Sequence, residues 1–199
     1  MVTKMGVAKK SDADVFKDVR RSGLIAITLK GEDELIAARF VGAKDDVLLI
    51  SAVGQAIRFH SGDVREMGRA AAGVIAMRLK GDDYVVSADV VPDDEDELGV
   101  LVITENGYGK TTPIKEYKTQ NRGGSGIKTA KVNDKTGQVV SGGAIKGDAR
   151  EDGEMVVMSR KGKVIKLSLK DVPGLGRQTQ GVRVMKLRSG DAIATVVYF

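Results

Sequence analysis

A glycine that closes a short polar loop and opens a β-rich run recurs four times along this chain of 199 residues. These closing glycines are Gly23, Gly73, Gly126 and Gly181, and their spacings are 50, 53 and 55 residues. Self-similarity with such a period is typical of repeat architectures, in which each unit buries its apolar face against its neighbours. The spacing therefore predicts a row of similar units and argues against one unrepeated core.

Short apolar or alternating runs, separated by tight turns, fill each unit. The clearest pair comprises residues 47–50 and 57–59, with Gly54 in the turn between them. This pattern predicts a β-hairpin in which glycine supplies the positive φ of the turn. A polar turn after each loop, such as residues 80–83, predicts a second hairpin with an apolar return strand. No segment shows the periodicity of an amphipathic helix, so we expect almost no helix.

Two hairpins per period give a four-stranded unit, and four-stranded units repeated in this way describe propeller-like folds. We predict an all-β fold of four antiparallel, four-stranded blades in a single repeat domain. The predicted repeats are residues 1–41, 42–91, 92–146 and 147–199. Aligning Gly6 with Gly54 leaves no counterparts for residues 47–49 in the first repeat, so we expect the chain to be an N-terminally clipped fragment.

The residues that carry most enzymatic chemistry are scarce. The chain has no Cys and a single His, His60, which excludes disulfides, thiolate metal sites and a convincing Ser-His-Asp triad. The Gly-rich stretches 123–126 and 142–143 lack the flanking residues of a dinucleotide site or a phosphate loop. No apolar run has the length of a membrane span, and no secretory signal opens the chain. We predict a non-catalytic cytoplasmic domain with no cofactor and no metal.

Charge is unevenly distributed along the sequence, whose formal net charge is +5. Residues 93–97 are all acidic and lie in the connector between the second and third repeats. Residues 160–188, in contrast, contain nine basic residues and one acidic residue. A regular array of basic loops, one per blade, would give the fold a basic rim. The alternative is an ordinary solvated surface on which both signs are mixed.

An arginine occupies the same repeat position in three units, as Arg69, Arg122 and Arg177. One interpretation is structural: each guanidinium ties down its loop by bonding to backbone carbonyls or to the acidic residue upstream. The other is functional, because a guanidinium fork suits phosphate oxygens and neighbouring glycine amides supply further donors. The sequence leaves both interpretations open.

Aromatic side chains are missing from these loops, which argues against stacking on single strands or on RNA bases. The pattern that remains favours duplex DNA bound through its backbone, without sequence readout. We predict that the contacts come from the repeated arginines and from basic residues near them. The candidates are Arg20, Arg21, Arg58, Arg65, Arg69, Lys110, Lys115, Lys118, Arg122, Lys128, Lys161, Lys163, Lys166, Lys170, Arg177 and Arg183.

Four motifs are specific in their order and spacing. They are Gly54-Gln55-Ala56-Ile57-Arg58-Phe59, Asp63-Val64-Arg65-Glu66-Met67-Gly68-Arg69, Thr104-Glu105-Asn106-Gly107-Tyr108-Gly109-Lys110 and Gly176-Arg177-Gln178-Thr179-Gln180-Gly181-Val182. They resemble the C-terminal domain of bacterial DNA gyrase A, and the resemblance covers essentially the whole chain. The resemblance implies a β-pinwheel, a propeller-like fold in which neighbouring blades exchange strands and a basic outer rim wraps duplex DNA.

The resemblance also implies a role within a larger enzyme. That enzyme is an ATP-dependent type IIA topoisomerase that introduces negative supercoils, and its nucleotide hydrolysis and DNA cleavage belong to other parts of it. The implied partners are duplex DNA, the rest of gyrase A and the gyrase B protein, in the bacterial cytoplasm at the nucleoid and without a membrane.

The sequence departs from the family in two respects. The hallmark heptapeptide of the family is Gln-Arg-Arg-Gly-Gly-Lys-Gly; residues 120–126 resemble it in a late repeat, with Asn121 and Ser125 in place of two basic residues. Pinwheels of gyrase usually have more blades than the units found here, so we expect the chain to correspond to the last ones. The related, degenerate pinwheel of topoisomerase IV is an alternative, and a propeller that binds protein on its face is another.

Overall fold

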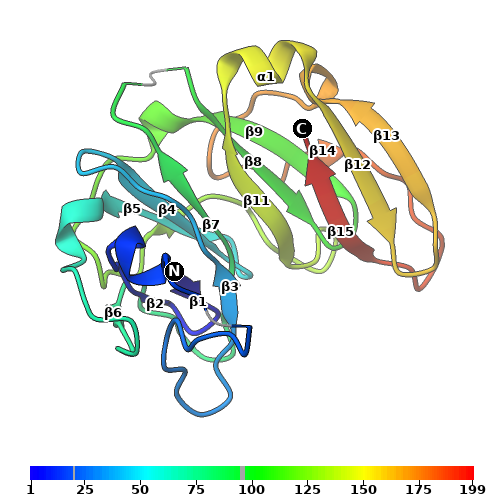
Figure 1. The fold of residues 1–199 in the computed structure, drawn as a ribbon. Coiled ribbons are helices and arrows are strands. Elements are labelled where there is room, and N and C mark those ends of the chain that lie inside the picture. Colours follow the sequence, from blue (N-terminus) through cyan, green and yellow to red (C-terminus); the bar gives the residue numbers. More distant parts are fainter. Residues whose placement is uncertain (20, 95–96) are drawn as a thin grey trace.

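The computed structural model describes residues 1–19, 21–94 and 97–199. Four antiparallel sheets lie side by side in an arc, and the N-terminal sheet and the C-terminal sheet form its two ends (Figure 1). We call these sheets blades 1 to 4. The all-β fold predicted from the sequence is confirmed.

Each blade is defined by its strand order. Blade 1 has the order β3-β1-β2-β6, with β1 (Val2–Thr3), β2 (Val7–Ala8), β3 (Leu35–Ala37) and β6 (Val74–Ile75). Blade 2 has the order β10-β5-β4-β7, with β4 (Asp46–Ser51), β5 (Gln55–His60), β7 (Val85–Val91) and β10 (Ile127–Lys128). Blade 3 has the order β11-β8-β9-β14, with β8 (Gly99–Thr104), β9 (Tyr108–Pro113), β11 (Val139–Ile145) and β14 (Val182–Arg183). Blade 4 has three strands in the order β13-β12-β15, with β12 (Glu154–Ser159), β13 (Val164–Ser168) and β15 (Ile193–Tyr198).

Little of the described chain is helical. Short 3₁₀ turns follow the second strand of each blade, as η1 (Ala13–Phe16), η2 (Ser61–Asp63), η3 (Ile114–Glu116) and η4 (Leu169–Asp171). One short helix, α1 (Gly147–Asp152), links blade 3 to blade 4. The near absence of helix agrees with the lack of any amphipathic period in the sequence.

The outermost strand of each of the first three blades comes from the following repeat. β6 pairs with β2, β10 pairs with β5, and β14 pairs with β9, all antiparallel. The predicted second hairpin is therefore wrong: residues 80–83 lead from β6 in blade 1 to β7 in blade 2. A local pattern shows that two segments are extended, but it does not show which edge each one joins. The exchange covers an edge strand that would otherwise expose its unpaired backbone groups.

The core lies between the blades. Along β4, Leu48 and Ile50 belong to an apolar cluster shared with blade 3, whereas Leu49 belongs to the cluster shared with blade 1. Along β8, Val102 faces the cluster with blade 2 and Leu101 faces the cluster with blade 4. Successive side chains of a strand point to opposite faces, so these central strands are buried on both sides and read as continuous apolar runs.

Two of the closing glycines, Gly73 and Gly126, have a backbone conformation that favours glycine. Gly73 has φ 95° and Gly126 has φ 73°, in the left-handed region that disfavours other residues. A Cβ at Gly73 would lie 2.6 Å from the carbonyl oxygen of Ala8, and one at Gly126 would lie 2.4 Å from that of Ala56. Glycine is therefore required twice over, by the positive φ and by the close approach of the preceding blade.

Candidate nucleic-acid interface

The repeated arginines connect successive blades. Nη1 of Arg177 donates to the carbonyl oxygen of Lys128 at 3.1 Å, and Nη1 of Arg122 donates to that of Ile75 at 2.9 Å. Nη1 of Arg69 makes the same contact with Ile25 at 3.1 Å. Each acceptor is the second residue after the closing glycine of the preceding repeat. The structural interpretation of these arginines is confirmed, because each guanidinium fastens its loop to the outer segment of the neighbouring repeat.

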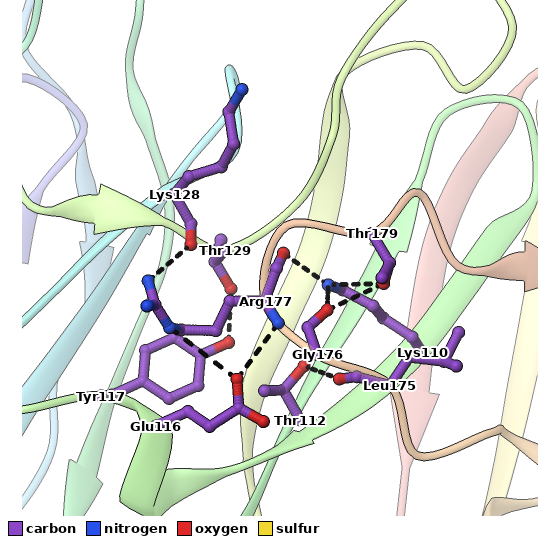
Figure 2. A network of polar contacts seen from close by, with 10 residues as sticks. All are labelled: Lys110, Thr112, Glu116, Tyr117, Lys128, Thr129, Leu175, Gly176, Arg177 and Thr179. Carbon is purple, nitrogen blue, oxygen red and sulfur yellow. Dashed lines mark hydrogen bonds and ion pairs between the residues drawn. The ribbon is translucent and has the colours of Figure 1, made fainter.

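The best-packed of these contacts lies between blades 2 and 3 (Figure 2). The Arg177 side chain is one-quarter exposed, and its Nε lies 3.9 Å from a carboxylate oxygen of Glu116, an ion-pair distance that is too long for a hydrogen bond. The same carboxylate oxygen accepts the backbone N–H of Arg177 at 3.3 Å. Nearby, the buried hydroxyls of Tyr117 and Thr129 share a hydrogen bond of 2.6 Å. The Lys128 side chain extends away from this network (Figure 2).

Lys110 is a correction to the predicted set of DNA contacts. It is 1% exposed, and its Nζ donates to the carbonyl oxygens of Gly176 at 2.7 Å and Arg177 at 2.6 Å, and to Oγ1 of Thr179 at 3.2 Å. Burial lowers the pKa of Lys110 to about 8, with a smaller upward effect from Glu116 and a downward one from Arg177. The ammonium supports the loop at residues 176–179 from beneath and does not face solvent.

Lys9 has the same supporting role in blade 1, although it is not among the candidate residues predicted from the sequence. Its side chain is buried, and Nζ donates to the carbonyl oxygens of Ala26, at 2.6 Å, and of Arg69. Lys9 is the third residue after Gly6, as Lys110 is the third after Gly107; the same position holds Ile57 in blade 2 and Ile165 in blade 4. The alternation of lysine and isoleucine at this repeat position is the sequence feature that could have identified Lys9. Burial lowers the pKa of Lys9 as well.

The structure distributes the other candidates unevenly. Arg58 is half-buried, and its Nε donates to a carboxylate oxygen of Asp46 at 2.6 Å. Its guanidinium is therefore paired with an acidic side chain inside the junction between blades 2 and 3. Arg122 is also half-buried, in the contact described above. Arg20 lies outside the described residues. The exposed candidates are Arg21, Arg65, Arg69, Lys115, Lys118, Lys128, Lys161, Lys163, Lys166, Lys170 and Arg183.

Several of the exposed candidates are held by protein oxygens. Nζ of Lys166 lies 2.6 Å from Glu154, and Nζ of Lys163 donates to the carbonyl oxygen of Lys186 at 2.6 Å. Nζ of Lys161 donates to the carbonyl oxygen of Ser189 at 3.0 Å. Arg183 donates to the hydroxyl of Tyr108 at 2.9 Å and lies over its ring. These contacts leave the cations at the surface, where their charge still acts on a polyanion.

The outer strands show where the surface becomes basic. The second residue after each closing glycine is exposed in every repeat: it is Ile25, Ile75, Lys128 and Arg183 in chain order. Lys115 in η3 and Lys170 in η4 add a further exposed lysine to each of the later blades. We call the outer strands β6, β10 and β14, with η3 and η4, the outer rim. Its apolar members come early in the chain and its basic members come late.

The described residues give no indication of a metal centre or of a membrane span. No group of three or more His, Asp or Glu side chains in this part of the chain is placed to hold a metal ion. No helix in the same residues is long and apolar enough to cross a bilayer.

Comparison with known proteins decides the family. The family model described as DNA gyrase C-terminal domain, beta-propeller, matches residues 1–41, 45–92, 100–146 and 153–198. The chain belongs to the DNA gyrase C-terminal domain family. The resemblance read from its motifs is thereby confirmed.

Relatives in this gyrase family are much longer than the chain. The DNA gyrase A protein of Staphylococcus epidermidis is 42% identical over 194 residues, which cover 98% of this chain and 21% of that protein. The DNA gyrase A protein of Haloquadratum walsbyi is 38% identical over 196 residues, covering 98% of this chain and 22% of that protein. The chain thus spans about one-fifth of the length of these relatives.

Solved structures give the same fold. The structure of a DNA gyrase A C-terminal domain superposes with a TM-score of 0.85 at 29% identity, covering 100% of this chain and 64% of that one. The C-terminal domain of a DNA topoisomerase IV superposes with a TM-score of 0.90 at 22% identity, covering 99% and 60%. The second likeness is one of fold alone, and the family match and the gyrase relatives identify this domain as gyrase-type.

Proposed function

We propose that this chain is a non-catalytic domain of DNA gyrase A that binds duplex DNA through its backbone and bends it along the outer rim. The observation that carries the proposal is the row of exposed cations on successive blades of a gyrase-type pinwheel: Lys115, Lys128, Lys170 and Arg183. Exposed cations on successive blades of a curved row suit a bent polyanion, because each phosphate contact adds to the others.

The partners follow from the family. The remainder of gyrase A, the gyrase B protein and duplex DNA in the bacterial cytoplasm are the proposed partners of the intact enzyme, a type IIA topoisomerase that introduces negative supercoils. Within it, this domain contributes DNA geometry and no chemical step. Arg69, Arg122 and Arg177 contribute indirectly, since their guanidinium groups position the loops whose neighbours face the ligand.

The contact test removes Lys128 and Lys170 together by substitution with Ala. Both side chains are exposed on the outer rim, on different blades. We expect binding to weaken similarly for unrelated duplexes, and the slope of log K against log salt to flatten by about two units, one per lost phosphate contact. The matched control replaces Lys30 and Lys80, exposed lysines of turns outside the outer rim, and should leave the slope near its original value.

Bending is measured separately by energy transfer between the ends of a labelled duplex of about 40 base pairs, well below the persistence length of DNA. The ends should approach each other as protein binds at low salt. Saturable binding without any approach of the ends would contradict bending. Loss of affinity for one duplex sequence alone would show base readout and would contradict a backbone-only mode.

A further inference from the structure

Three segments carry the chain from one blade to the outer strand of the blade before it. They comprise residues 61–75, 114–128 and 169–183, and each has 15 residues. Each segment begins with the 3₁₀ turn of its own blade, η2, η3 or η4, and ends in β6, β10 or β14. We call them the first, second and third crossover. Because their lengths are equal, their residues can be compared position by position.

The first and second crossovers are held by equivalent backbone contacts. The first ends in Ile75, which pairs with β2, and the second ends in Lys128, which pairs with β5 in the same antiparallel register. A repeated arginine holds the carbonyl oxygen of each, Arg122 at 2.9 Å for Ile75 and Arg177 at 3.1 Å for Lys128. Both crossovers have described repeats on either side, so their surroundings are equally complete. The two positions therefore differ chiefly in the side chain that the shared backbone presents.

The crossovers place different charges on this backbone. All three have an acidic residue at the third position and an arginine at the ninth. Beyond this constant pair, the second crossover adds Lys115, Lys118 and Lys128, whereas the first adds one charge of each sign, Arg65 and Glu66. The third adds two cations and no further acidic residue. The excess of positive charge is thus concentrated on the second and third crossovers.

The added cations of the second crossover face solvent without a protein partner. Lys115, Lys118 and Lys128 are exposed, and within the described residues their ammonium groups make no hydrogen bond or ion pair. The constant acidic residue of this crossover is Glu116, and Nε of Arg177 lies 3.9 Å from its carboxylate. The negative charge of Glu116 is therefore partly compensated, while the three lysines stay available to an anion.

The first crossover has no comparable surface. Arg65 lies between two exposed acidic residues, Asp63 and Glu66, and the segment ends in Ile75, which is 54% exposed. Arg122 donates to the backbone carbonyl of Asp63 at 2.7 Å, so this contact does not neutralise the Asp63 carboxylate. Charges are screened beyond about 8 Å at physiological salt, so these local charges act on a nearby phosphate more than the net charge of the chain does.

We propose that the second crossover, residues 114–128, holds duplex DNA by its phosphates, and that the first crossover, residues 61–75, borders the same duplex without holding it. The inference rests on the proposed binding of DNA along the outer rim. Phosphate contacts fix the position of a protein on a duplex. The duplex is therefore fixed on blades 2 to 4 and free to leave the rim at blade 1.

Two variants remove one cation from equivalent places. Arg65 and Lys118 both occupy the fifth position of their crossovers, and both are exposed. Binding of the 199-residue chain is measured against two unrelated duplexes of about 40 base pairs over a series of salt concentrations. We expect Lys118→Ala to weaken binding to both and to flatten the slope of log K against log salt by about one unit. Arg65→Ala should leave the slope at its original value.

A third variant adds a cation to the first crossover. Ile75→Lys gives this segment the lysine that the second crossover has at its last position, on an equivalent backbone. We expect the slope to steepen by about one unit, because the duplex that borders the segment gains a phosphate contact. Leu29→Lys is the matched control: Leu29 is an apolar residue, 41% exposed, beside a turn outside the outer rim, and its replacement should leave the slope unchanged.

Three results would overturn the inference and leave DNA binding by the domain intact. Equal flattening by Arg65→Ala and Lys118→Ala would show that both crossovers hold phosphates. An unchanged slope with Lys118→Ala would show that the second crossover makes no such contact. An unchanged slope with Ile75→Lys would show that the duplex does not border the first crossover. If the combined replacement of Lys128 and Lys170 also leaves the slope unchanged, the proposed function itself fails.

Discussion

Arg177 and Lys128 belong to different repeats, yet the guanidinium of the first holds the backbone carbonyl of the second at 3.1 Å. The Lys128 side chain leaves that contact and extends into solvent (Figure 2). One residue is thus fixed through its backbone while its charge stays available to a ligand. This division separates two roles that a repeated basic residue can have, and it allows each role to be tested alone.

Arg177→Ala should destabilise the fold and change the salt dependence of DNA binding little. Loss of the hydrogen bond to Lys128 and of the ion pair with Glu116 should lower the free energy of unfolding by about 1–3 kcal/mol. Urea unfolding measures that loss. Lys128→Ala is the contrasting variant: it should leave stability nearly unchanged and flatten the salt slope by about one unit. Equal effects of the two variants on the slope would show that Arg177 also contacts phosphate.

Lys110→Met should alter how stability depends on pH. The folded-state pKa of Lys110 is about 8, below its usual value of 10.5, so above pH 8 the folded chain releases this proton before the unfolded chain does. Since the unfolded state then binds more protons, this group makes stability rise between about pH 8 and 10.5 and adds no slope below that window. The variant lacks this rise. The unfolding free energy of the unmodified chain, minus that of the variant, should therefore be more positive at pH 10 than at pH 7. An unchanged difference would contradict a depressed pKa.

Gly126→Ala should be among the most damaging single substitutions in the chain. The new Cβ would lie 2.4 Å from the carbonyl oxygen of Ala56, in addition to the strain of φ 73°. Gly81→Ala has the strain of φ 57° but meets no atom within 4 Å, so it should cost only about 1–3 kcal/mol. The thermal midpoint should fall further for Gly126→Ala, and the difference between the two variants measures the close approach between repeats.

Tyr117→Phe should leave a buried polar group without a partner. Its hydroxyl and Oγ1 of Thr129 share a 2.6 Å hydrogen bond where both side chains are almost fully buried. Removing one partner should cost about 1–3 kcal/mol, because the Thr129 hydroxyl loses its bond and finds no water. Adding Thr129→Val should recover part of that loss. A double-mutant cycle by chemical unfolding gives the coupling energy, and independent, additive losses would show that the bond contributes nothing.

The sequence predicted the features that are local to one repeat. The four closing glycines, the turn at Gly54 and the all-β fold all follow from short patterns, and the positive φ expected at Gly54 is confirmed. The pairing of β6 with β2 was not predictable in this way, since an alternating segment carries no label for the edge that it joins. Resemblance to the gyrase family supplied the strand exchange that the periodicity did not.

The candidate site was only partly predictable for a related reason. Sequence identifies a lysine but not the direction of its side chain, so Lys110 and Lys128 looked alike although one is buried and the other exposed. Lys9 and Lys110 differ from Ile57 and Ile165 at the same repeat position, and only the structure shows that the two lysines bind loop carbonyls. Which of the exposed cations contact DNA stays a prediction.

Strand exchange also has a consequence for a chain that has been cut. A protease that cleaves the exposed turn at residues 80–82 leaves β4 and β5 on one fragment and β7 and β10 on the other. Blade 2 then consists of strands from both fragments, joined by the long antiparallel pairing of β4 with β7 and by the pairing of β5 with β10. The nick changes covalent connectivity but divides no sheet, so the two pieces hold together as a noncovalent complex until the blade between them unfolds.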